Sequence, residues 1–380
     1  MHLPIYLDYN ATTPVHPNVL ETMLPFFNAD FGNAASIAHI YGLKAADAIE
    51  TARNQVAQLI GASNNEIIFT SGATESVNLA IKGAFEANKH KGNHIITTKT
   101  EHKAVIDTCN HLKQIGAEVT FLEVDSLGNF SLESIQKAIK PTTILISIMA
   151  ANNEIGNLYP IEEIAKLAHE KGVLFHTDAT QAIGKININL KESNIDLLSF
   201  SAHKFYGPKG VGALFVRKNV GLTAQQDGGM HERGLRSGTL NVPGIVGMGK
   251  AAEIAKIEME ADKIRISAMR DKLESQLLKT VPNAKVNGDP INRLFNTTNI
   301  SLGKIDGELL LMKLNKIAVS NGSACNSAST KPSYVLKAMG LDDDSAFGSI
   351  RFSLGKFTTE NELEEAIGHL LEVITNFTSI

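Results

Sequence analysis

Seven short runs of apolar and β-branched residues recur through the first two thirds of the chain. They cover residues 67–70, 94–98, 118–124, 143–149, 173–178, 195–200 and 211–216. Most of these runs are apolar throughout, which is typical of strands that a parallel sheet buries on both faces. Amphipathic stretches suited to helices lie between them, at residues 74–88, 102–115, 132–139 and 161–171. The alternation predicts an α/β fold with a mostly parallel seven-stranded sheet covered by helices.

The last third of the chain has a different pattern. Residues 244–279 are suited to one long helix or two, and Pro282 would stop it. Short strands are predicted at 297–301 and 317–320, and helices at 307–314, 333–339 and 360–375. We therefore expect a large domain formed by residues 16–260. A smaller α+β domain is expected from residues 1–15 together with 261–380.

Composition excludes several classes of protein. The 36 basic and 40 acidic residues give a net charge of −4, which argues against an electrostatic role at nucleic acid or membrane surfaces. No apolar run approaches the roughly 18 residues of a membrane span, and the start of the chain lacks a signal-peptide pattern. The two cysteines, Cys109 and Cys325, cannot form a disulfide framework or a four-cysteine zinc site. A reducing cytoplasm fits this composition best, and no metal is expected.

Two polar residues follow buried strands that are neighbours along the chain. Asp178 ends the run 173–178, and Lys204 follows the run 195–200 in the segment Ser-Ala-His-Lys. Desolvation at such a position prepares a lysine for Schiff-base chemistry, and a carboxylate there can bond a protonated pyridine nitrogen. Pyridoxal phosphate requires this pair, a lysine for its aldehyde and an acid for its ring nitrogen. Taken singly, however, Lys204 is more typical of an ordinary loop lysine, and Asp178 is at least as typical of a helix-capping aspartate.

Three further segments could hold parts of a ligand. Residues 70–76, Thr-Ser-Gly-Ala-Thr-Glu-Ser, join a strand to a helix and would expose backbone N–H groups to a phosphate, although a plain capped helix is the alternative. His102 could stack on a flat ring or relay a proton, or simply begin a helix. Asn153 could position a ligand oxygen, or belong to an ordinary turn.

Candidate residues for substrate chemistry lie near the end of the chain. Cys325 stands in a run of small polar residues, 318–329, which predicts an exposed loop and a thiol free to act as a nucleophile. Cys109 is predicted to be a packing residue. Arg351 could clamp a carboxylate bidentately or form a surface ion pair. Residues 228–239 are too rich in glycine and charge for a regular element and suggest a loop that meets a ligand or another subunit.

These segments, in this order, resemble the cysteine desulfurases of the NifS/IscS type, which are fold-type-I pyridoxal-phosphate enzymes of the class V aminotransferase group. The resemblance extends from Tyr-Leu-Asp-Tyr-Asn-Ala-Thr-Thr at residues 6–13 to Arg-Phe-Ser-Leu at 351–354. The IscS-like branch is most similar, because the segment around Cys325 has its long Ser-Ala-Cys-x-Ser-Ala-Ser form. The resemblance implies a homodimer with the site at its interface, and a catalytic cysteine loop at about residues 320–335.

The resemblance implies a role for each candidate residue. Lys204 matches the Schiff-base lysine, Asp178 the partner of the pyridine nitrogen, and His102 the ring-stacking histidine, which is also a proposed acid/base. Gln181 matches the residue near the ring hydroxyl. The expected phosphate-binding residues are Ala73, Thr74, Ser201, His203 and, toward the partner subunit, Thr239. Asn153 and Arg351 match substrate-binding residues, with Arg351 holding the carboxylate of L-cysteine.

The implied reaction converts L-cysteine to L-alanine and leaves a persulfide on Cys325, which passes its sulfur to an acceptor for iron–sulfur cluster assembly or for tRNA or DNA thiolation. Asp227, Met230 and Ala150 depart from the usual residues of the branch, and the chain stops at Ile380 without the tail used toward the assembly scaffold. A dedicated thiolation pathway is therefore one expectation for the acceptor.

Other functions compete with this one. A selenocysteine lyase or another class V lyase would use the same fold, but Cys325 in a long loop favours the desulfurase. A persulfide carrier without catalysis is disfavoured by the presence of Lys204, Asp178 and His102. A nicotinamide enzyme is disfavoured because residues 247–252 match the pattern GxGxxA without a preceding strand.

Overall fold

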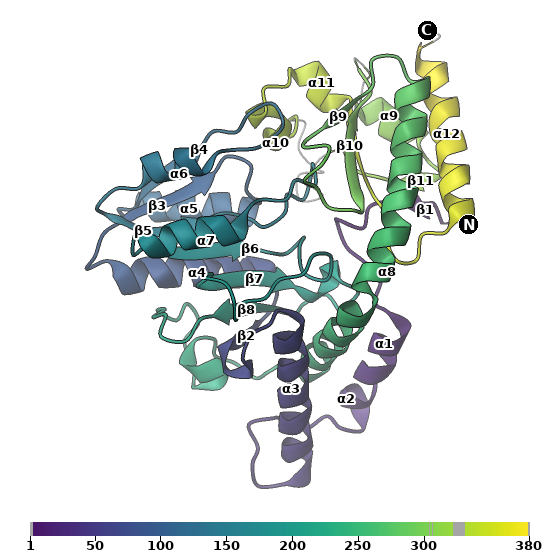
Figure 1. Cartoon of the computed structure of the whole chain (residues 1–380). Helices are drawn as coiled ribbons and strands as arrows, with labels where there is room; N and C mark the ends of the chain where they lie inside the picture. Colours follow the sequence, from purple (N-terminus) through teal and green to yellow (C-terminus); the bar gives the residue numbers. More distant parts are fainter. Residues whose placement is uncertain (1–2, 304, 306, 322–330, 379–380) are drawn as a thin grey trace.

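The computed structural model describes residues 3–303, 305, 307–321 and 331–378, and its largest element is a seven-stranded sheet (Figure 1). The strands are β2 (Ile67–Thr70), β3 (His94–Thr98), β4 (Glu118–Leu122), β5 (Thr143–Ser147), β6 (Leu174–Asp178), β7 (Leu197–Ser201) and β8 (Gly212–Val216). Their order across the sheet is β2-β8-β7-β6-β5-β3-β4. Each of the seven predicted runs overlaps one of these strands, so the expected sheet is confirmed.

The sheet is mostly parallel because β8 alone is reversed. Strands β3, β4, β5, β6 and β7 pair in parallel, whereas β8 pairs antiparallel with both β7 and β2. The β7 and β8 strands are fully buried, in agreement with their apolar sequences. The exception is β4 at the edge of the sheet, where Glu118 is exposed.

Helices cover both faces of the sheet. One face carries α4 (Ala73–Asn88) and α5 (Lys103–Gln114) in a common apolar cluster. The other carries α3 (Ile40–Leu59), α6 (Leu132–Ala138) and α7 (Ile161–Glu170). The sequence did not predict α3, because most residues of its buried face are small or charged and so carry a weak apolar signal; they are Gly42, Ala45, Ala52, Arg53 and Ala57. Before α3 lie α1 (Pro17–Met23) and α2 (Pro25–Asn28).

One long helix, α8 (Val242–Thr280), connects the sheet to the rest of the molecule (Figure 1). Its buried residues from Val242 to Ala255 join the core on the α3 face, and those from Ile266 to Leu277 join a second core. The predicted domain boundary at residue 260 falls between these two stretches and stays a prediction. None of the described helices combines the length and apolar character needed to cross a bilayer.

The second core lies beneath two small sheets. The antiparallel sheet has the order β12-β10-β9, with β9 (Lys285–Asn287), β10 (Thr297–Ser301) and β12 (Ser349–Ser353). The other pairs β1 (Ile5–Tyr6) with β11 (Ile317–Ala318), so the start of the chain packs here. The helices of this part are α9 (Gly307–Lys313), α10 (Tyr334–Ala338), α11 (Asp343–Phe347) and α12 (Glu360–Thr378).

A buried histidine connects three strands of the large sheet. The ring of His176 in β6 places Nδ1 2.8 Å from Ser147 Oγ of β5 and Nε2 2.9 Å from Ser199 Oγ of β7. Burial lowers the pKa of His176 to about 3. An unfolded histidine has a pKa of about 6.5, so below that pH the unfolded chain binds a proton that the folded chain does not. The folded state therefore loses stability as the pH falls from about 6.5 toward 3.

We expect His176→Asn to flatten this acid-induced loss. Between pH 7.5 and 5.5, unfolding in urea should show the wild type losing about 1.4 kcal/mol more of its free energy of unfolding than the variant. The control His111→Gln removes a solvent-exposed histidine and should retain the wild-type dependence. An identical pH dependence in wild type and His176→Asn would contradict the assignment.

Candidate active site

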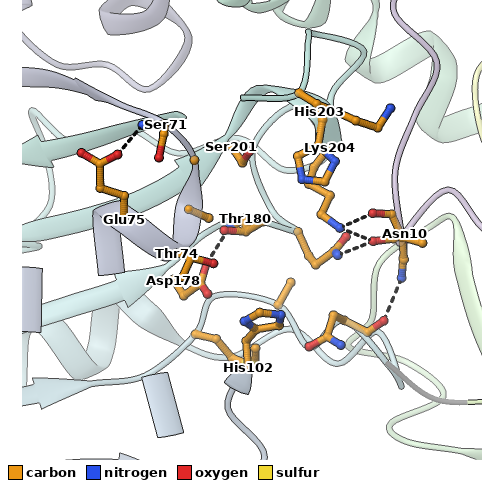
Figure 2. Close-up of a pocket in the computed structure, with 18 of the residues that line it drawn as sticks. Asn10, Ser71, Thr74, Glu75, His102, Asp178, Thr180, Ser201, His203 and Lys204 are labelled. Carbon is orange, nitrogen blue, oxygen red and sulfur yellow. Dashed lines mark hydrogen bonds between the residues drawn. The ribbon is translucent and has the colours of Figure 1, made fainter. Parts of the chain in front are cut away.

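A cavity of about 410 Å³ opens at the edge of the sheet where the parallel strands end (Figure 2). The predicted residues that line it are Ala73, Thr74, His102, Asn153, Asp178, Gln181, Ser201, His203, Lys204 and Arg351. They come from the segments after β2, β3, β5, β6 and β7, and from β12 of the smaller part. Parallel strands present their carboxyl ends at one edge, which brings together the residues at the ends of β2, β3, β5, β6 and β7. Arg351 reaches the same cavity from β12 of the small antiparallel sheet.

Lys204 is held by the start of the chain. It ends the short 3-10 helix Ala202–Lys204 that follows β7, and its Nζ donates to the carbonyl oxygens of Asn10 at 2.6 Å and Ala11 at 2.7 Å (Figure 2). Asn10 is itself fixed, because its backbone N–H donates to Ser353 Oγ and its Nδ2 donates to Thr297 Oγ1, each at 2.9 Å. Asn10 belongs to the motif at residues 6–13, but no local pattern in the sequence points to its role.

Gln181 extends this network to a second buried lysine. Its Nε2 donates to the same Asn10 carbonyl at 2.9 Å, and its Oε1 accepts from Lys185 Nζ at 3.2 Å. Burial, with the nearby charge of Lys204, lowers the pKa of Lys185 to about 7. Gln181 therefore has a defined orientation, with its amide N–H side turned to Asn10.

Asp178 lies across the cavity at the end of β6. Its Oδ1 accepts from the Thr180 N–H at 2.9 Å, which is the local turn expected of an aspartate at this place (Figure 2). The carboxylate also lines the cavity, so the capping and ligand-binding interpretations are both compatible with the structure. Thr180 Oγ1 is buried and has no hydrogen-bond partner among the described residues.

His102 begins α5 and lines the cavity as well. Its Nδ1 accepts from the Ala104 N–H at 3.1 Å, which caps the helix and leaves the ring facing the cavity. The preceding residue, Glu101, is fully buried, and burial raises the pKa of its carboxyl well above the ordinary value. Its Oε1 accepts from the Met149 N–H at 2.8 Å, which ties the turn before α5 to the end of β5.

The N-terminus of α4 forms the wall suited to a phosphate. Gly72 precedes the helix with φ +157°, a conformation that other residues rarely adopt, and Ser201 Oγ lies close by. Backbone N–H groups in the first turn of a helix have no partners within it and attract anions. His203 also lines the cavity, and its Nδ1 lies 3.0 Å from Thr12 Oγ1. Burial, together with Lys204, lowers the pKa of His203 to about 4.

Arg351 is buried and paired, in contrast to the surface ion pair considered as its alternative. Its side chain is 1% exposed, and one terminal nitrogen donates to Asp8 Oδ1 at 2.5 Å. The other donates to the Asn153 carbonyl at 2.9 Å. Asn153 Oδ1 is buried without a hydrogen-bond partner in the described part of the chain.

Two predicted residues do not line this cavity. Thr239 is exposed at the end of the glycine-rich segment. Cys325 lies outside the described residues. The described residues that flank its segment are fastened near the site, because the Arg351 N–H donates to the Ser320 carbonyl at 2.7 Å and Ser333 Oγ donates to Glu154 Oε2.

These groups fit pyridoxal phosphate. Among the described residues, the buried oxygens of Asn153 and Thr180 have no hydrogen-bond partner, and the start of α4 at Gly72 leaves backbone N–H groups available to a ligand. Lys204 would hold the aldehyde carbon, Asp178 the ring nitrogen and the α4 N-terminus the phosphate. The lining thus offers a separate group to each polar part of the cofactor.

Comparison with known proteins also points to a pyridoxal-phosphate enzyme. The family described as Aminotransferase class-V matches residues 5–365. Cysteine desulfurase IscS of Anaeromyxobacter sp. strain K is 54% identical over 369 residues, which cover 97% of this chain and 91% of that protein.

Two solved structures are also similar. A NifS-like protein has a TM-score of 0.92 at 41% identity, covering 98% of this chain and all of its own. A structure described as SspA in complex with cysteine has a TM-score of 0.83 at 40% identity, covering 93% of this chain and all of its own.

We expect Gly212→Ala to weaken cofactor binding. A Cβ at Gly212 would lie 2.6 Å from the Gly72 Cα, so the α4 cradle must shift. The dissociation constant for pyridoxal phosphate, measured by titrating cofactor-free protein, should rise about tenfold, or about 1.4 kcal/mol. Gly221→Ala is the control, because among the described residues nothing beyond its two chain neighbours lies within 4 Å of its Cβ position. Equal affinities for the Gly212 variant and the wild type would contradict the cradle.

Proposed function

We propose that this chain, which belongs to the class V aminotransferase family of pyridoxal-phosphate enzymes, is a cysteine desulfurase that converts L-cysteine to L-alanine. The observation that carries the proposal is the convergence of Lys204, Asp178 and Arg351 on one cavity. A lysine for an aldehyde, an acid for a pyridine nitrogen and a guanidinium for a carboxylate are together suited to an amino-acid substrate. The 54% identity to a cysteine desulfurase favours cysteine over other amino acids.

The protein's side chains bind and orient the substrate. Arg351 donates to the carboxylate of L-cysteine, and Asn153 offers an amide whose oxygen is unpartnered among the described residues. Pyridoxal phosphate, when bound, supplies an electron-withdrawing ring that accepts electron density from the substrate's Cα. Asp178 stabilises the protonated ring nitrogen and so strengthens that withdrawal.

Two residues are placed to move protons. Lys204 Nζ, which the Asn10 and Ala11 carbonyls orient, would take the proton from the substrate's Cα. His102 lies on the neighbouring wall of the cavity and acts as the second acid/base.

Cys325 receives the sulfur. Its thiolate attacks the sulfur of L-cysteine, a bond between the two sulfur atoms forms, and the substrate's Cβ–S bond breaks with its electron pair remaining on carbon. The carbon skeleton takes up a proton at Cβ and leaves as L-alanine, while Cys325 keeps a persulfide. The proposal for Cys325 is supported by its sequence context and by the attachment of Ser320 and Ser333 near the site.

The persulfide then passes to an acceptor. A protein of iron–sulfur cluster assembly is suggested by the name of the IscS relative. A thiolation enzyme acting for tRNA or DNA is the alternative that the departures at Asp227, Met230 and Ala150 suggest. We place the activity in the cytoplasm, where a thiol nucleophile stays reduced.

The chain acts as a homodimer in this proposal. Large apolar side chains are exposed over residues 20–43, where a monomer would ordinarily cover them. They are Leu20, Leu24, Phe27, Phe31, Ile37, Ile40, Tyr41 and Leu43. Thr239 is exposed and so is available to reach the phosphate site of a partner subunit.

Replacing the nucleophile tests the reaction. We expect Cys325→Ala to retain the visible absorption of the bound cofactor but to lose sulfide release from L-cysteine by at least about a hundredfold. Cys109→Ala is the matched control, because Cys109 is fully buried and burial raises the pKa of its thiol to about 12. An unchanged rate in Cys325→Ala would remove this residue from the mechanism.

Charge on the apolar segment tests the dimer. The wild type should sediment near twice the 41.0 kDa mass of one chain, and Phe27→Asp with Phe31→Asp should shift it toward one chain. Ile291→Asp, at a position 84% exposed outside this segment, should remain dimeric. A monomeric wild type would overturn this part of the proposal.

A further inference from the structure

The guanidinium of Arg351 already has an anionic partner in the protein. Asp8 Oδ1 accepts from one terminal nitrogen at 2.5 Å, and the Asp8 side chain is 15% exposed while that of Arg351 is 1% exposed. Asp8 is fixed by its backbone, since its carbonyl accepts from the Ala11 N–H and the Tyr6 hydroxyl, both at 2.9 Å. The pair is therefore built into the junction of β1 and β12.

Donors remain on Arg351 for a second anion. A guanidinium carries five N–H groups, and the contacts to Asp8 and to the Asn153 carbonyl each use one terminal nitrogen. The Nε is buried and has no hydrogen-bond partner among the described residues. A ligand carboxylate that reaches Arg351 from the cavity therefore shares the guanidinium with Asp8.

Sharing has an electrostatic cost. With Asp8 ionised, the Arg351 pair has no net charge, and a second carboxylate brings a like charge close to the first in a desolvated place. A guanidinium without such a partner would hold a ligand carboxylate more tightly.

We infer that Asp8 acts through Arg351 and weakens the hold of this guanidinium on the substrate and product carboxylates. The inference rests on the proposed function, in which Arg351 binds that carboxylate. L-Alanine leaves with the same carboxylate that L-cysteine brought, so a moderated contact speeds product release and raises KM together. Asp8 thereby influences the rates at which L-cysteine binds and L-alanine leaves.

Ligand binding to the cofactor-free protein tests this without any turnover. Titration calorimetry compares 3-mercaptopropionate, which carries the carboxylate and thiol of cysteine, with cysteamine, which lacks the carboxylate. Asp8→Asn should bind 3-mercaptopropionate three- to tenfold more tightly than the wild type, with cysteamine unchanged. Asp8→Ala removes the same charge and should also bind 3-mercaptopropionate more tightly. Asp8→Glu keeps the charge and should retain the wild-type affinity.

Matched controls separate the possible results. Glu274→Gln breaks a comparably buried pair with Arg293, 2.7 Å apart and outside the cavity lining, and should alter neither affinity. If Arg351→Gln weakens 3-mercaptopropionate but neither Asp8 variant tightens it, Asp8 only orients Arg351 and the inference is wrong. If Arg351→Gln also changes nothing, the carboxylate site in the proposed function is wrong. In the loaded enzyme, Asp8→Asn should lower KM for L-cysteine and lower kcat.

Discussion

The carboxyl ends of the parallel strands meet at one edge of the sheet, and the rest of the site depends on this constraint. Asp178 ends β6, Lys204 follows β7 and the phosphate cradle follows β2, so three distant segments face one cavity without any further folding device. The reversed strand β8 begins at this same edge. Its Gly212 allows the close approach of the α4 start.

Three basic side chains near this edge have polar or acidic partners within the protein. Lys204 and Lys185 lie on a network through Gln181 and Asn10, and burial lowers the pKa of Lys185 to about 7. The positive charge of Arg351 is balanced by Asp8. The pairing of Arg351 with Asp8 suits repeated exchange of a zwitterionic substrate and product better than permanent tight binding.

Residues adjacent to strong local patterns could be predicted from the sequence. Asp178 ends one apolar run, Lys204 lies four residues after another, and Gly72 stands between a strand and a helix. Asn10, Asp8 and Lys185 could not be predicted in this way, because their positions depend on tertiary pairing between the chain start, β12 and the turn after β6. Helix α3 was not predicted for another reason. The small residues and Arg53 on its buried face differ little in hydrophobicity from its exposed face.

The fate of the carbon skeleton tests the central claim most directly. L-Cysteine is given to the pyridoxal-phosphate-loaded protein with a thiol reductant, and alanine, sulfide, pyruvate and ammonia are measured in the same reaction. Attack by Cys325 on sulfur leaves the electron pair on carbon, so alanine and sulfide should appear in equal amounts. Pyruvate and ammonia accompanying the sulfide, with no alanine, would mean that sulfur leaves by elimination and would contradict the account.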